Sequence, residues 1–291
     1  MAASQPSWTG LIPIDDTALA VTDLGGSGLP VVYLNGSYAD QSHWRRVVAD
    51  LGSGWRHILY DERARGRSKV SADYSYEACV RDVDAVLAAR GVERALLVGW
   101  SYGAYIGVQW AARNPERALG VVAVEGAFPW GWTDEVGHER VRKQFRQMRL
   151  FLPLVRPMGL AARMSAEQHA NINIENHKLA AAFGSVLDSV TVPVRYVLAT
   201  GASLGGGEEE FKEMRASIEP ALARNSNLKL SAQVASNHQT ILRRDYQAVA
   251  EAAREIAAMD SGERAHPMLE RRAAASLSAG VRNVGASVSR D

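Results

Sequence analysis

The sequence ALLVGWSYGAYIGVQW, residues 95–110, places a serine at the junction of two different patterns. Its first four residues are an apolar run typical of a buried strand, and residues 104–117 follow with the pattern of a helix. Gly99 and Gly103 flank Ser101 in the form G-x-S-x-G, which predicts a tight strand-to-helix turn because glycine lacks the side chain that would clash there. Such a turn exposes the serine hydroxyl above a sheet edge. The alternative is a serine that only caps the helix.

Similar apolar runs alternate with helical stretches along most of the chain, which is typical of a mostly parallel sheet covered by helices. Residues 10–26 indicate two strands with a turn at Asp15 and Asp16, the one place where an antiparallel pair is expected. The remaining runs are 30–36, 56–62, 95–101, 118–126, 192–201 and 228–238. Their valines and leucines do not alternate with polar residues, so we expect helices on both faces. One such helix is 76–91, which Gly91 closes.

Composition narrows the class of protein. The chain has 291 residues, of which 47% are hydrophobic, and 33 Lys+Arg nearly balance 32 Asp+Glu. This balance gives no positive electrostatic field that would attract nucleic acid or an anionic membrane. We therefore expect a small-molecule partner, and a homodimer is also possible. Cys79 is the only cysteine, which excludes an intramolecular disulfide and favours a reducing compartment. The start of the chain lacks the pattern of a secretion signal, so a cytoplasmic protein without a membrane span is expected.

The alternation of predicted strands and helices divides the chain into segments of unequal length. Residues 1–9 are expected to be an N-terminal extension, and 10–126 together with 190–258 to form the core. Residues 127–189 separate two strands by about 60 residues, where a few turns are usual, so we interpret them as a helical cap over a pocket. The alternative is a pair of surface helices. Residues 259–291 are rich in Ala, Ser, Gly and Arg, and we expect a disordered tail.

A serine hydroxyl needs a base within hydrogen-bond reach before it can attack a substrate. His238 ends the last strand-like run, so a parallel sheet brings it to the same edge as Ser101. His43 is the second choice because it follows the loop after strand 30–36. The other histidines lie on predicted surface helices, at loop starts or in the tail.

The imidazole needs an acid that orients it and stabilises its charged form. Strand 192–201 has no acid after it until Glu208, whereas Glu125 ends the earlier run at the carboxyl edge of the sheet. A carboxylate at the end of an apolar strand is costly without a partner, so Glu125 is preferred to Glu208 or Glu209. The three consecutive glutamates that begin at Glu208 suit the start of a helix.

Acyl transfer also needs hydrogen-bond donors for the oxyanion that develops on the substrate. The amide of Tyr102, just after the serine, supplies one donor, and the amide of Ser37, or of its neighbour Tyr38, supplies the other. The residues expected to line the substrate pocket include aromatic and apolar side chains of the proposed cap. They are Asn35, Tyr38, Trp100, Trp130, Phe145 and Met148. Core packing explains the cap side chains equally well, and the arginines of the cap leave an anionic substrate open.

Several motifs in order resemble the α/β-hydrolase family with a helical cap, over residues 10 to 258. Residues 34–37 stand in the place of the family's His-Gly oxyanion loop, and residues 61–68 resemble its D-x-R-G-x-G-x-S loop. The serine turn and the Ser-Asn-His that ends at residue 238 complete the resemblance. It implies a mostly parallel eight-stranded sheet flanked by helices. Asn35 replaces the usual histidine and Ala64 a glycine, and some members carry the acid where Glu125 stands.

The residues together predict a serine hydrolase that cleaves a small carboxylic ester, lactone or thioester through an acyl-enzyme on Ser101, without a cofactor. Other chemistry on the same fold stays open, because the fold hosts acyltransferases, lyases, carbon–carbon hydrolases and cofactor-free peroxidases. A binding protein that keeps the pocket without turnover is the third hypothesis.

Overall fold

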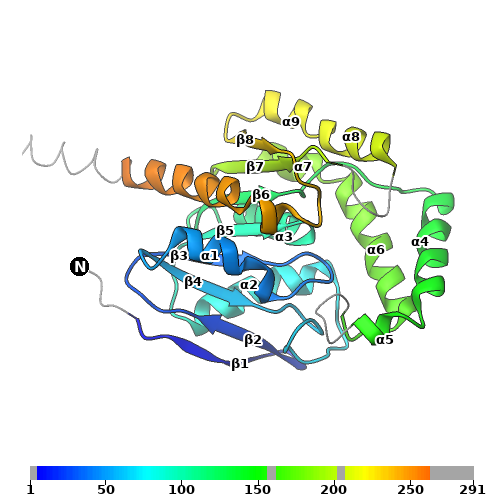
Figure 1. The fold of residues 1–291 in the computed structure, drawn as a ribbon, viewed down its shortest axis with the longest axis horizontal. Coiled ribbons are helices and arrows are strands. Elements are labelled where there is room, and N and C mark those ends of the chain that lie inside the picture. The colour runs from blue at the N-terminus through cyan, green and yellow to red at the C-terminus, as the bar shows by residue number, and fades with distance from the viewer. Residues whose placement is uncertain (1–4, 156–161, 202–206, 263–291) are drawn as a thin grey trace, which may run out of the picture.

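A single eight-stranded sheet forms the centre of the computed structural model, which describes residues 5–155, 162–201 and 207–262 (Figure 1). The strand order is β1-β2-β4-β3-β5-β6-β7-β8. The strands are β1 (Trp8–Ile14), β2 (Thr17–Asp23), β3 (Leu29–Leu34), β4 (Trp55–Tyr60), β5 (Ala95–Trp100), β6 (Ala118–Val124), β7 (Val194–Ala199) and β8 (Leu228–Val234). The predicted mostly parallel sheet of eight strands is confirmed. The expectation of a single antiparallel pair is wrong, because β2 pairs antiparallel with both β1 and β4.

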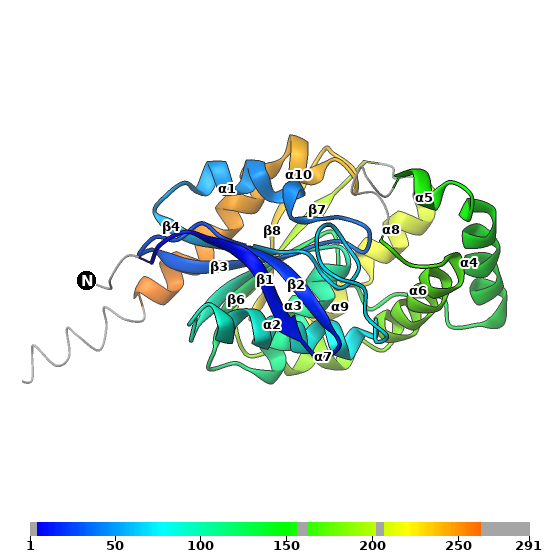
Figure 2. The ribbon, with the colours of Figure 1, turned by 90° about the horizontal axis from the view of Figure 1, so that it is seen from below.

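Helices cover both faces of the sheet, as the unbroken apolar runs predict (Figure 2). Along β3, Val32 and Leu34 point to one face and Val31 and Tyr33 to the other. The first face carries α2 (Tyr76–Ala89), α3 (Tyr102–Arg113), α7 (Gly184–Ser189) and α9 (Glu219–Arg224). The opposite face carries α1 (Arg45–Leu51), which follows η1 (Gln41–Trp44), together with α10 (Ile241–Arg244) and the helix 246–262.

Local sequence sets the ends of these helices. At the start of α2, the hydroxyl of Ser75 accepts a hydrogen bond from the amide of Ala78, which satisfies a donor that the helix itself leaves free. At its end, Gly91 has φ of +60°, a conformation that glycine adopts without strain. The helix predicted over 76–91 is therefore confirmed to within two residues.

Four further helices are found in the described residues. They are α4 (Glu135–Met148), α5 (Leu152–Val155), α6 (Ala166–Ala181) and α8 (Glu208–Ala216). Asp134 caps α4, and Ser165 with Gln168 forms a reciprocal cap at the start of α6. In both views α4, α5 and α6 lie together at one end of the molecule (Figures 1 and 2). By contrast α7, in the same insertion, buries Leu187 in the main core.

The ends of the chain differ from the expected boundaries. Strand β1 begins at Trp8, inside the segment expected to be an extension, and the last helix continues to residue 262. Most of the predicted tail, 263–291, lies outside the described residues. Within the part of the chain that the structure describes, no helix is both long and apolar enough to cross a membrane.

Candidate active site

Ser101 occupies a strained turn between β5 and α3. Its φ and ψ are 56° and −116°, outside the regions that non-glycine residues usually adopt. A Cβ on Gly99 would lie 2.3 Å from the carbonyl oxygen of Gly103, and one on Gly103 would lie 2.1 Å from that of Leu34. Both positions therefore need glycine, because the clashing atoms belong to the backbone. The predicted strand-to-helix turn is present, and it sets the serine above the N-terminus of α3.

Glu125 lies at the carboxyl end of β6, one strand beyond Ser101, and is buried. Its Oε1 accepts a hydrogen bond of 2.7 Å from the amide of Ala199. Arg215 on α8 binds both carboxylate oxygens, with Nε 3.1 Å from Oε1 and Nη2 3.0 Å from Oε2. Burial alone raises the pKa of a carboxyl group, but hydrogen bonds and charge from His238 and Arg215 outweigh it and lower the pKa of Glu125.

His238 lies in the loop after β8 and faces Glu125. Its Nδ1 is 3.5 Å from Glu125 Oε2, which is an ion-pair distance when the imidazole is protonated. The indole Nε1 of Trp100 donates to the carbonyl oxygen of His238, and the two rings are 5.6 Å apart between centroids. These contacts hold the imidazole over the end of β5. Ser101 and His238 line the same cavity, so the structure brings together the three residues that the sequence proposes as a triad.

The alternative acids and the alternative base lie in other surroundings. Glu208 and Glu209 lie in the first turn of α8, and their side chains are 70% and 81% exposed. Both form ion pairs with Lys212. His43 shares the cavity with His238, but its ring interacts with Asp40, and that hydrogen bond raises the pKa of His43. Among the candidates weighed, Glu125 is therefore the acid whose carboxylate faces His238.

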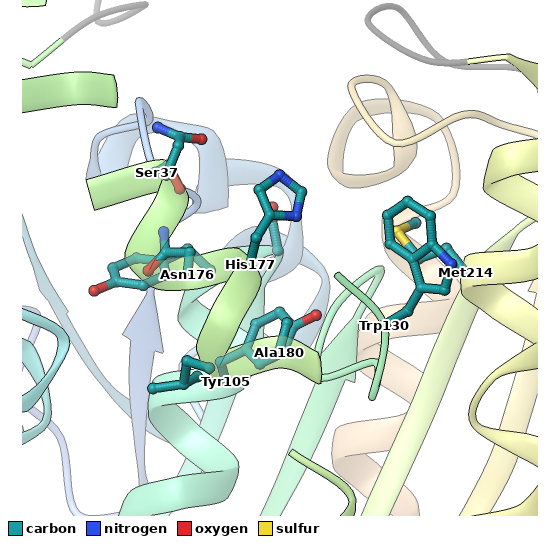
Figure 3. A pocket seen from close by; sticks show the side chains of 11 residues that line it. Ser37, Tyr105, Trp130, Asn176, His177, Ala180 and Met214 are labelled. Atoms are coloured by element: carbon teal, nitrogen blue, oxygen red, sulfur yellow. The ribbon is translucent and has the colours of Figure 1, made fainter. Parts of the chain in front are cut away.

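Two cavities meet at Ser101. The first, which we call the α6 cavity, has a volume of about 160 Å³ and is shown in Figure 3. Its lining residues are Ser37, Ser101, Tyr102, Tyr105, Trp130, Asn173, Asn176, His177, Leu179, Ala180 and Met214. The second, the Trp100 cavity, has a volume of about 360 Å³. It is lined by Gly36, Ser37, Tyr38, Ala39, His43, Trp100, Ser101, Asn173, His238 and Gln239.

The two residues predicted to supply the oxyanion donors both line this site. Ser37 lines both cavities and Tyr102 lines the α6 cavity. Tyr102 is the first residue of α3, so its amide has no acceptor within the helix. Arg65 links the two positions, because its Nε donates to the carbonyl oxygen of Ser37 at 2.9 Å and its guanidinium lies 6.0 Å from the ring centroid of Tyr102. Sequence reasoning missed Arg65, although it stands in the run 61–68.

Asn35 does not line either cavity, which corrects its prediction as a pocket residue. The side chain is buried, and its Nδ2 donates to the carbonyl oxygen of Tyr60 and to Glu62 Oε2. Its Oδ1 accepts from the indole of Trp44 at 2.7 Å. The amide of Asn35 also donates to Glu62 Oε1. All these hydrogen bonds are made to other parts of the protein. They fix the loop that leads to Ser37.

Three of the remaining pocket predictions agree with the cavities and two do not. Tyr38 and Trp100 line the Trp100 cavity, and Trp130 lines the α6 cavity. Phe145 is buried between α4 and α6, where it stacks on His169 at 5.5 Å, and Met148 at the end of α4 lines neither cavity. The apolar stripe of α4 packs α4 on α6 instead of roofing the pocket.

The arginines of α4 are also absent from both cavities. Arg142 pairs with Glu135 and Arg146 pairs with Glu139 on the exposed face of the helix. Their charges are balanced locally, so they supply no anion site at Ser101.

Glu62 is a buried carboxyl group next to the oxyanion loop, and it gives a testable pH dependence. Burial raises its pKa from 4.5 to about 7. Between these values the folded protein binds a proton that the unfolded chain releases, so stability falls as pH rises through this window. The free energy of unfolding of the wild type, relative to Glu62→Gln, should fall by about 3 kcal/mol from pH 4.5 to 7.5. Urea unfolding at several pH values measures this difference, and a constant difference would contradict it.

Comparisons with known proteins identify the family of this fold. A family model described as the alpha/beta hydrolase fold matches residues 30–175, which is half of the chain. The chain therefore belongs to the α/β-hydrolase fold family. The structure is also similar to a thermophilic esterase from Thermogutta terrifontis, with a TM-score of 0.64 and 19% identity over 86% of this chain and 99% of that one. At this identity the likeness concerns the fold.

Two curated relatives extend the comparison. A haloalkane dehalogenase from Mesorhizobium japonicum is 31% identical over 140 residues, which are 47% of this chain and 45% of the relative. Epoxide hydrolase B from Mycobacterium tuberculosis is 35% identical over 102 residues, 34% of this chain and 29% of the relative. The chain thus spans less than half the length of either relative.

Proposed function

We propose that the protein is a serine hydrolase that cleaves small carboxylic esters, lactones or thioesters. The observation that carries this proposal is the placement of Ser101, at a strained turn, in one cavity with His238, whose ring faces the buried Glu125. Nucleophile, base and orienting acid in this arrangement form the general apparatus for acyl transfer.

In the proposed reaction His238 takes the proton of the Ser101 hydroxyl while the oxygen attacks the substrate carbonyl. The amides of Ser37 and Tyr102 donate to the oxygen that becomes negative. His238 then gives the proton to the leaving oxygen or sulfur, and the carbon–leaving-group bond breaks to leave an ester on Ser101. Water, deprotonated by His238, attacks this ester, and the serine leaves with the proton as the carboxylic acid is released.

Glu125 acts on the imidazole in this scheme. The lowered pKa keeps Glu125 ionised at neutral pH, so its negative charge faces Nδ1 and stabilises the imidazolium that forms when Ser101 loses its proton. Arg215 and the amide of Ala199 hold the carboxylate in this orientation. Arg215 is thus a positioning residue.

A serine nucleophile favours acyl substrates over the haloalkanes and epoxides named for the two relatives. Attack of a serine oxygen on the carbon of a haloalkane or an epoxide would form an ether. Water cannot release an ether by addition to a carbonyl, so Ser101 would be blocked after one event. Attack on an ester forms a new ester, which water opens. Turnover with Ser101 as the nucleophile therefore favours carbonyl substrates.

The position of His238 supports a proposal for what each cavity holds. A leaving group must receive its proton from His238, which lines the Trp100 cavity and not the α6 cavity. We therefore place the leaving group in the Trp100 cavity and the acyl group in the α6 cavity. Helices α4, α5 and α6 then act as a cap, because α6 supplies one wall of the acyl site.

A substrate panel tests the proposed reaction. Wild type should hydrolyse p-nitrophenyl butanoate with kcat/KM of about 10³ M⁻¹s⁻¹ or more, somewhat below the usual range for natural substrates. It should release no halide from 1-bromobutane and no diol from 1,2-epoxybutane beyond one equivalent per enzyme. Repeated release of halide or diol without ester turnover would contradict the proposal.

A further inference from the structure

Helix α6 directs a polar surface into the proposed acyl site. Asn176 and His177 follow Asn173 by three and four residues, and Ala180 follows them by four and three, so the four residues share one face of the helix. All four line the α6 cavity, and Asn176, His177 and Ala180 are labelled in Figure 3. We infer that the acyl group of the substrate carries an uncharged hydrogen-bonding group, an oxo or hydroxyl group, that Asn176 and His177 recognise. This inference rests on the proposed function, whose acyl site it describes.

His177 lines this cavity and carries a hydrogen-bond donor. Its Nδ1 accepts a hydrogen bond from the amide of Trp132 at 3.4 Å, and its ring stacks on Trp132 at 4.6 Å between centroids. Burial lowers the pKa of His177, so the ring is neutral at pH 7. A neutral imidazole that accepts at Nδ1 carries its proton on Nε2. That N–H is a suitable donor to a carbonyl or hydroxyl oxygen.

Asn176 supplies a second polar group. Its Oδ1 is buried, and within the described residues it has no hydrogen-bond partner. The oxygen is not exposed to the cavity as the side chain is placed, so Asn176 reaches the cavity with the rest of its side chain. A half-turn of the amide exchanges its oxygen and its NH₂ group, so Asn176 can pair with a hydroxyl or with a carbonyl oxygen.

The rest of the lining excludes charge and limits size. Among the described residues that line the α6 cavity, no side chain is a lysine, arginine, aspartate or glutamate. A carboxylate or an ammonium group would therefore lose its water without gaining an opposite charge. The volume of about 160 Å³ is close to the roughly 150 Å³ of a cavity that holds benzene. An acyl tail of about six non-hydrogen atoms therefore fits this space.

Apolar side chains surround the polar ones and complete the site. Trp130 and Met214 lie opposite α6 in Figure 3, and Leu179 and Ala180 extend the apolar surface along the helix. This combination fits a short carbon chain interrupted by one oxygen-bearing carbon. A purely alkyl chain would leave the donor of His177 and the amide of Asn176 unpaired.

A pair of esters of nearly equal size tests this inference. The p-nitrophenyl esters of 4-oxopentanoic acid and pentanoic acid differ by one carbonyl oxygen. Wild type should prefer the oxo ester by at least about fivefold in kcat/KM, the value of one uncharged hydrogen bond. The ratio should approach one in His177→Phe, which keeps an aromatic ring against Trp132, and in Asn176→Leu. Asn171→Leu, an exposed position on α6 outside the α6 cavity, should keep the ratio of wild type.

Equal kcat/KM values of wild type for the two esters, or a preference that survives in both variants, would overturn the inference. A binding measurement separates this result from failure of the proposed function. Ser101→Ala should bind 4-oxopentanamide more tightly than pentanamide in an NMR titration, and His177→Phe in the same background should lose that difference. If neither ester is hydrolysed but the amides differ, the reaction is wrong and the recognition stands; if the amides do not differ, the recognition is wrong.

Discussion

Ser101→Ala is expected to lower kcat for p-nitrophenyl butanoate by about 10⁴-fold or more, because the variant has no atom that can form the acyl-enzyme. The fold should be unaffected, since alanine lacks only the hydroxyl, and KM should change little. Hydrolysis assays at neutral pH measure the loss, and circular dichroism confirms that the variant is folded. Residual activity should come from oxyanion stabilisation alone.

The matched control is Ser185→Ala, a change of the same kind at an exposed position of α7. It should leave kcat and KM unchanged. Ester hydrolysis by Ser101→Ala at more than a tenth of the wild-type rate would contradict the role of Ser101, whatever the control shows.

Glu125→Gln is expected to lower kcat by about 10³- to 10⁴-fold at pH 7. Glutamine keeps the size of the side chain, but it removes the negative charge that faces His238, so the imidazolium that forms in the first step loses its stabilisation. Esterase assays on the folded variant measure the effect. An unchanged kcat would show that another residue supplies the acid, even if the hydrolase assignment stands.

Arg215 complicates this test and also provides its control. Glu125→Gln leaves the guanidinium without its carboxylate, and an unpaired, mostly buried charge destabilises a fold by about 3 kcal/mol or more. The double variant Glu125→Gln/Arg215→Met removes both charges, so it should regain stability without regaining activity. Recovery of activity in the double variant would mean that the single variant failed through misfolding.

The sequence predicts the frame of this site well because its signals are local. The turn at Ser101 needs small residues on both sides, and the backbone clashes that a side chain would make at positions 99 and 103 explain why glycine is present there. Strand ends in a parallel sheet gather at one edge, which is enough to propose Glu125 and His238 from their positions after apolar runs.

The sequence does not predict the roles of some residues correctly. These roles are set by contacts between distant segments, which residue spacing does not reveal. The apolar stripe of α4 that includes Phe145 predicts a buried helix face. Only the structure shows that this face packs against α6 and does not line the cavity. His177 and Asn176 lie on a helix with mixed polarity, so nothing in their sequence separates them from a solvated surface. Arg215 is 90 residues from Glu125, and helical periodicity says nothing about such a partner.

The claim that Ser101 is an activated nucleophile can be tested most directly by covalent labelling. Wild type treated with a fluorophosphonate should gain the mass of one phosphonyl group, and peptide mass spectrometry should locate it on Ser101. Ser101→Ala should gain none. A folded wild-type protein that does not react, or that carries the label on another residue, would contradict the proposed function.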